Sequence, residues 1–98
     1  MTNFYVTYVI KDSETRDAFY NEVKKCRVAE KSRGEEGCIR YEFFYPADND
    51  SNMFLWEQWE SRDAQAAHLK TPHYADFAEI KNRYKVETNV IAEDQVIS

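Results

Sequence analysis

The sequence has very few of the two residues that interrupt secondary structure, with two glycines and two prolines among 98 residues. This scarcity excludes collagen-like and linker-rich proteins and predicts long elements joined by few turns. No apolar run approaches the roughly 20 residues that span a membrane. Residues 1–4 lack the basic start and apolar core of a signal peptide. We therefore expect one cytoplasmic domain covering residues 1–98.

Cysteine and histidine are equally scarce, with two of each. Cys26 and Cys38 lack CxxC spacing, so we expect reduced, structural thiols rather than a disulfide or zinc scaffold. His68 and His73 are five residues apart, which is not the i, i+4 spacing that brings two ligands to one metal on a helix. We expect no metal site. The net charge of −5 argues against a nucleic-acid partner.

Aromatic residues are abundant: the chain has two Trp, seven Tyr and six Phe. A hydrophobic fraction of 43% excludes a compositionally disordered chain. A domain of this length buries only a modest core, so that core must hold an unusual number of rings.

Hydrophobic periodicity and capping residues predict the order β-α-β-β-α-α-β. β-branched and aromatic runs mark strands at Phe4–Ile10, Cys38–Tyr45, Met53–Glu60 and within Val86–Ile97. A helix of about five turns should follow the Asp12–Ser13 cap and end at Gly34, and shorter helices should begin after Ser61 and at Thr71–Pro72. This order matches a ferredoxin-like α+β fold, in which helices cover one face of a four-stranded antiparallel sheet.

Strand alternation predicts that neither face of the third strand is plainly polar. The third strand places Leu55 and Trp59 on one face and Phe54 and Trp56 on the other. The second strand should turn Ile39, Tyr41, Phe43 and Tyr45 to one face, and Cys38, Arg40, Glu42 and Phe44 to the opposite face. Because the helices cover only one face, we expect a homodimer that buries the other.

Two polar residues lie in apolar surroundings. Glu57 falls between Leu55 and Trp59, where it is either a structural hydrogen-bond acceptor or a pocket acid that fixes a substrate hydroxyl or a histidine. His68 follows the third strand closely and is either structural or a base. His73, near a helix start, could simply bond the helix terminus. Buried Tyr8, Tyr41 and Trp59 suit either the core or an amphipathic pocket.

Three segments resemble the antibiotic biosynthesis monooxygenase superfamily. They are Glu35-Glu36-Gly37-Cys38, Glu57-Gln58-Trp59-Glu60-Ser61 and His68-Leu69-Lys70-Thr71-Pro72-His73. The sequence looks most like the quinol monooxygenase branch. It is also similar to the branch that processes the phosphorylated autoinducer-2 signal.

The resemblance implies a dimeric α+β barrel that oxidises a small aromatic substrate with dioxygen, without metal, flavin or haem as cofactor. It implies that His68 is the catalytic base or proton shuttle and that Glu57 positions this histidine or a substrate hydroxyl. Tyr8, Tyr41, Trp59 and His73 would bind the substrate. Haem-degrading relatives carry an Asn and a His where this chain has Tyr8 and Ala78, so haem degradation is not expected.

Two alternatives remain open at the level of the sequence. The first is an isomerase or degradative enzyme for a phosphorylated, sugar-like signal, whose phosphate would need Arg40, Lys70 or Lys81. The second is a non-enzymatic ligand-binding dimer, in which Glu57 and His68 are satisfied inside the fold.

Overall fold

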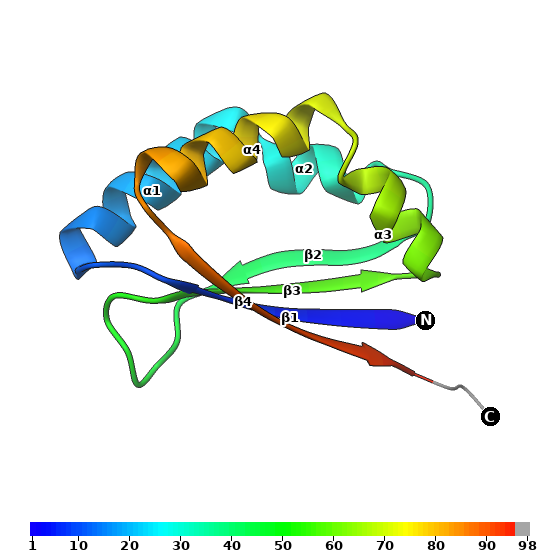
Figure 1. Ribbon diagram of the computed structural model, residues 1–98, viewed down its shortest axis with the longest axis horizontal. Helices are drawn as coiled ribbons and strands as arrows, with labels where there is room; N and C mark the ends of the chain where they lie inside the picture. Colours follow the sequence, from blue (N-terminus) through cyan, green and yellow to red (C-terminus); the bar gives the residue numbers. More distant parts are fainter. Residues whose placement is uncertain (96–98) are drawn as a thin grey trace.

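The computed structural model describes residues 1–95, which form one four-stranded sheet and four helices (Figure 1). The sheet order is β2-β3-β1-β4, and every pairing is antiparallel. The predicted ferredoxin-like α+β fold is confirmed. The elements are β1 (Thr2–Val9), α1 (Ser13–Cys26), α2 (Val28–Arg33), β2 (Cys38–Phe44), β3 (Met53–Trp59), α3 (Arg62–His68), α4 (Pro72–Arg83) and β4 (Glu87–Asp94).

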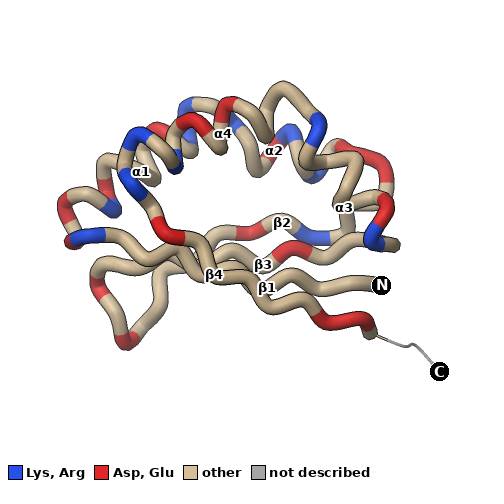
Figure 2. Tube along the Cα trace, in the orientation of Figure 1, with Lys and Arg blue, Asp and Glu red and all other residues tan. Residues whose placement is uncertain are grey.

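The helices lie on one face of the sheet and leave the other face open (Figure 1). Alternate residues of β3 are buried beneath the helices, as the strand period requires. Charged residues concentrate on α1, α2 and α4, whereas β1 has none (Figure 2). Among residues 1–95, no helix combines the length and apolar character needed to cross a bilayer.

The first helical region differs from its prediction. Instead of one helix of about five turns, α1 ends at Cys26 and α2 begins at Val28. Arg27 joins them in the left-handed conformation, with φ of 60°. The backbone N–H of Arg27 bonds the carbonyl of Lys24, as at a helix C-terminus. Helical spacing of apolar residues continued through this point, so it could not reveal the break.

The prediction for the start of β2 was also wrong. A register shift between Cys38 and Arg40 leaves Ile39 without a partner, and its side chain is exposed. Such a bulge reverses which face the preceding residues point to. Cys38 therefore packs against the core and Ile39 does not, whereas Tyr41 is buried as expected. Tyr45 lies beyond the strand and is exposed.

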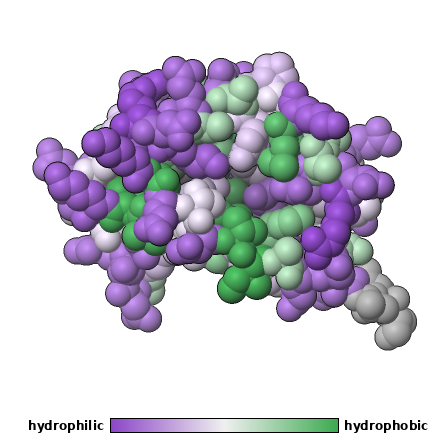
Figure 3. All heavy atoms as spheres, viewed as in Figure 1, coloured by the Kyte–Doolittle hydropathy of each residue, from purple (hydrophilic) through white to green (hydrophobic). Residues whose placement is uncertain are grey.

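The open face of the sheet carries an apolar patch beside polar and charged side chains such as Arg40, Glu42 and Gln58. A hollow of about 510 Å³ is lined there by Thr7, Phe44, Pro46, Asn52, Phe54 and Trp56. Ile91 of β4 pairs with Tyr5 on the same face and is 68% exposed. Apolar atoms are also exposed at the centre of Figure 3, over β4. The strand predicted within Val86–Ile97 spans Glu87–Asp94, and residues 96–98 lie outside the described residues.

Candidate functional site

A cavity of about 80 Å³ lies between the sheet and the helices α3 and α4. All four strands contribute to its lining, as do both helices. Leu69 and Val90 belong to the lining and are about half exposed, so they mark the mouth. The polar residues of the lining include Tyr8, Tyr41, Glu57, Tyr74 and Lys81.

Glu57 brings a buried carboxyl group to this cavity. Glu57 lies on β3, where it pairs with Phe4 of β1 and with Tyr41 of β2. Its Oε1 accepts a hydrogen bond from Trp59 Nε1 at 2.9 Å. Burial raises the pKa of Glu57 to about 7, although the Trp59 hydrogen bond and Lys81 both oppose the shift. The carboxyl therefore gains or loses a proton near neutral pH, as a general base requires.

Three tyrosine hydroxyls and one ammonium group also belong to the polar lining. Burial raises the pKa of Tyr8 and of Tyr41 well above the ordinary value, so both phenols remain protonated donors. Lys81 Nζ lies 3.4 Å from Tyr74 Oη and 4.8 Å from the centre of the Phe77 ring. The cavity thus pairs an acid that titrates near neutrality with a nearby cation.

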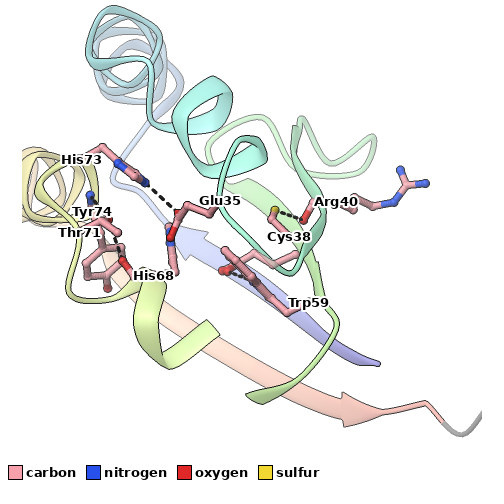
Figure 4. A network of polar contacts seen from close by, with 9 residues as sticks. Glu35, Cys38, Arg40, Trp59, His68, Thr71, His73 and Tyr74 are labelled. Carbon is pink, nitrogen blue, oxygen red and sulfur yellow. Dashed lines mark hydrogen bonds and ion pairs between the residues drawn. The ribbon is translucent and has the colours of Figure 1, made fainter. Parts of the chain in front are cut away.

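Glu35, His68 and His73 form a second polar cluster. Glu35 Oε2 lies 2.6 Å from His68 Nδ1 and 2.8 Å from His73 Nε2 (Figure 4). The side chains are largely buried, with exposed fractions of 15%, 1% and 13% for Glu35, His68 and His73. One carboxylate oxygen therefore meets two imidazole rings, and these three side chains could hold a metal ion.

A tight turn between α3 and α4 brings the two histidines together. Thr71 Oγ1 donates to the carbonyl oxygen of His68 at 2.8 Å and accepts from Tyr74 N at 3.2 Å. The second bond caps α4, and Pro72 occupies its first turn. Because the chain reverses between two helices, the spacing rule for one continuous helix does not apply to this pair.

His68 is sealed by aromatic rings. Its ring centre lies 5.0 Å from Trp59, 5.4 Å from Tyr41 and 5.2 Å from Tyr74. Burial lowers the pKa of His68 despite the contact with Glu35, so the neutral imidazole is favoured. Its Nε2 is buried and has no hydrogen-bond partner among the described residues.

The structure divides the predicted site residues into two groups. Tyr8, Tyr41 and Glu57 line the cavity. Trp59, His68 and His73 are not among the described residues that line the cavity. They lie behind its wall, in contact with Glu57 or Glu35. Glu57 bonds Trp59, whereas His68 contacts Glu35, so the two proposed catalytic residues have different partners.

Glu35 and Tyr74 were missed as functional candidates, and Lys81 was considered only as a phosphate-binding cation. Glu35 was noticed only as part of a sequence segment, because nothing local shows that it meets histidines 33 and 38 residues away. Tyr74 and Lys81 had a detectable signal: they are three residues before and four residues after Phe77, and so share its face of α4. Arg40, Lys70 and Lys81 were considered as phosphate-binding cations, and among the described residues Lys81 alone of these three lines the cavity.

Comparison with known proteins supports the observed fold. YjcS from Bacillus subtilis, an uncharacterized protein, is 30% identical over 74 residues, which cover 74% of this chain and 69% of YjcS. A crystal structure from Deinococcus radiodurans, provisionally described as an antibiotic biosynthesis monooxygenase, superimposes with a TM-score of 0.86. The two chains are 17% identical, and the match covers 100% of this chain and 95% of the Deinococcus chain. At that identity the likeness concerns the fold alone.

A shorter match involves the uncharacterized protein sll1783 from Synechocystis. It is 38% identical over 50 residues, covering 51% of this chain and only 34% of sll1783. The profile of the antibiotic biosynthesis monooxygenase family matches residues 7–80, which include β2, β3 and α3 and end before β4. The chain belongs to the antibiotic biosynthesis monooxygenase family.

Proposed function

We propose that the protein is a monooxygenase of a small quinol or related aromatic, with the proton chemistry carried out by its own side chains. The observation that carries the proposal is Glu57, a buried carboxyl with a pKa of about 7 that faces a cavity lined by tyrosines. At neutral pH about half of such carboxyl groups are ionised, and the ionised form can accept the proton of an aromatic hydroxyl.

Removal of that proton makes the ring electron-rich enough to reduce dioxygen. One oxygen atom then enters the ring and the other leaves as water, so a hydroquinone and dioxygen give a hydroxyquinone and water. Tyr8 and Tyr41 would donate hydrogen bonds to the oxygen atoms that become negative. Lys81 would stabilise the same charge, since its ammonium lies beside this lining.

The size of the cavity limits how a substrate binds. Its volume of about 80 Å³ is roughly half that of the apolar cavity that holds benzene in another protein. The edge of the ring that carries the hydroxyl would enter, while the rest of the ring would lie at the mouth against Leu69 and Val90. Small, flat substrates are therefore preferred to bulky ones.

His68 has a supporting role in this proposal. Tyr41 and Tyr74 line the cavity and also pack against the His68 ring. His68 would therefore act by holding the two rings in place. Trp59 positions Glu57 through its hydrogen bond, and His73 acts on His68 through Glu35 rather than on the substrate.

We also propose that a second copy of the chain covers the open face of the sheet. The apolar hollow around Phe54 and Trp56 and the exposed Ile91 lie on that face. Burial of apolar surface of this extent favours association.

Oxygen uptake with a panel of hydroquinones tests the enzymatic proposal. Glu57→Gln keeps an acceptor for Trp59 but cannot take a proton, so we expect the rate to fall at least about 100-fold. His68→Gln should reduce the rate less. Glu60→Gln, at an exposed position just after β3, is the matched control and should leave the rate unchanged. Equal rates in wild type and Glu57→Gln would exclude Glu57 as the base.

A non-enzymatic ligand-binding protein is the second candidate. It is favoured by the small cavity and by the sealed position of His68. Under this alternative, hydroquinones bind in a calorimeter while no protein-dependent oxygen uptake occurs. Binding of inorganic phosphate that is lost in Lys81→Met would instead favour a phosphorylated substrate.

A further inference from the structure

We infer that Glu35, His68 and His73 form a binding site for a divalent transition-metal ion of the zinc class. The site lies behind the cavity wall. It goes beyond the proposed reaction, which takes place at Glu57 and does not require it.

The side chains that converge here are the right ligands for such an ion. Two imidazoles and one carboxylate suit zinc and its neighbours, whereas calcium and magnesium prefer sites made only of oxygen. Glu35 comes from the segment before β2, His68 from the end of α3 and His73 from the start of α4. Three separate elements thus direct one ligand atom each toward one point (Figure 4).

The distances fit an ion after a small adjustment. The three ligand atoms all lie within 4.8 Å of one another. Zinc ligands at about 2.0–2.2 Å from the ion are about 3.3 Å apart in a tetrahedron. Glu35 Oε2 is now 2.6 and 2.8 Å from the two nitrogens, so it must withdraw by roughly half an ångström. Its partly exposed position beside a turn allows that movement.

The surroundings of His68 provide an independent observation. Its Nε2 is buried without a polar partner, beside the rings of Trp59, Tyr41 and Tyr74. Aromatic faces carry partial negative charge, so they tolerate an N–H better than a bare lone pair. When the hydrogen is on Nε2, the Nδ1 lone pair is free to bind a cation, which would replace the hydrogen shared between Nδ1 and Glu35 Oε2 at 2.6 Å.

The charge balance of the cluster favours the same occupant. Within residues 1–95, the ion pairs of Glu35 involve only the two histidines, and no lysine or arginine reaches its carboxylate. A divalent ion would neutralise this charge. His73 and Glu35 keep some solvent exposure, so a water molecule can supply a fourth ligand.

Zinc and cobalt binding to the chelator-treated, full-length protein tests this inference. We expect about one equivalent of Zn²⁺ to bind in calorimetry, and bound Co²⁺ to show the visible bands of a low-coordinate ion. His73→Gln and Glu35→Gln should each weaken binding by at least about tenfold. Both residues are partly exposed, and circular dichroism verifies that each variant folds.

Two controls distinguish this site from others. Glu36→Gln changes the neighbouring carboxylate and should not alter affinity. Cys38→Ser should not alter it either, since burial raises the pKa of that thiol to about 11 and keeps it protonated. The inference is overturned if the wild type binds no Zn²⁺ at about 100 μM, if both cluster variants bind like wild type, or if only Cys38→Ser loses binding. Oxygen uptake is not a readout, so failure here leaves the proposed reaction unaffected.

Discussion

At the scale of single residues, the decisive feature is a carboxyl group that the fold keeps away from water. Glu57 lies among apolar neighbours on β3 and has one hydrogen bond, from Trp59. That bond stabilises the charged form but does not compensate for burial, so the pKa remains raised. Such a group reduces stability when ionised, and its retention in the core is consistent with a functional role.

This pKa shift predicts how stability depends on pH. The pKa of Glu57 is about 7 in the folded protein against 4.5 in the unfolded chain. The folded state therefore binds more protons between these values, and its stability falls as pH rises from about 4.5 to 7. Below pH 4.5 the contribution is fully present, and above pH 7 it is lost.

Glu57→Gln should remove this dependence. From the size of the shift, we expect the free energy of unfolding of wild type to fall between pH 5 and pH 8 by on the order of 3 kcal/mol relative to that of the variant. Urea unfolding of both proteins at several pH values measures the difference and cancels the contributions of other groups. Parallel curves for the two proteins would show that the Glu57 pKa is not raised.

At the scale of elements, the turns decide where the site residues lie. Gly37 precedes β2 with φ of 85°, and its carbonyl accepts from Glu60 N at 2.8 Å. This conformation fixes the path of the chain between Glu35 and Cys38. The Thr71 turn does the same for His68 and His73. The cluster of Glu35, His68 and His73 therefore depends on the connections between regular elements, not on the elements alone.

Gly37→Ala should be clearly destabilising. A Cβ at this position would lie 2.6 Å from Ala64 Cβ, and the left-handed backbone adds a further penalty. We expect a loss of at least about 2 kcal/mol in the free energy of unfolding. Chemical denaturation followed by tryptophan fluorescence measures it.

Gly34→Ala is the matched control for that experiment. Gly34 has φ of −81°, and an added Cβ would meet nothing closer than the Lys31 carbonyl oxygen at 3.5 Å. We expect unchanged stability or a gain of about 0.5 kcal/mol. A similar loss in both glycine variants would contradict the role given to the Gly37 conformation.

At the scale of the whole molecule, one layer of helices on a sheet leaves a face with an apolar patch uncovered. Phe44, Phe54 and Trp56 border a hollow on that face, and Ile91 projects from β4. The proposed dimer follows from this asymmetry, because water contact with the face is unfavourable.

Ile91→Glu should separate the two copies. The side chain is 68% exposed in a single chain, so the fold tolerates the change, whereas an interface on this face would bury an unpaired charge. Sedimentation at micromolar concentration should show a dimer for wild type and a monomer for the variant. Leu69→Glu, on the helix side, should remain dimeric. A monomeric wild type would refute the proposed dimer.

The sequence alone determined the order of the elements, the antiparallel sheet and the unusual position of Glu57. These features depend on periodicity and capping, which are properties of neighbouring residues. The bulge at Ile39 and the break at Arg27 were missed, because the local pattern is compatible with either outcome.

Only the tertiary structure decided which polar residues meet. Glu35 contacts histidines 33 and 38 positions away, and Lys81 reaches a cavity lined by all four strands. No periodicity encodes such contacts, because they depend on how the α3–α4 turn and the segment before β2 pack on one sheet. Glu57, His68 and His73 could be named as candidates from the sequence, but Glu35 and the contacts among these residues required the fold.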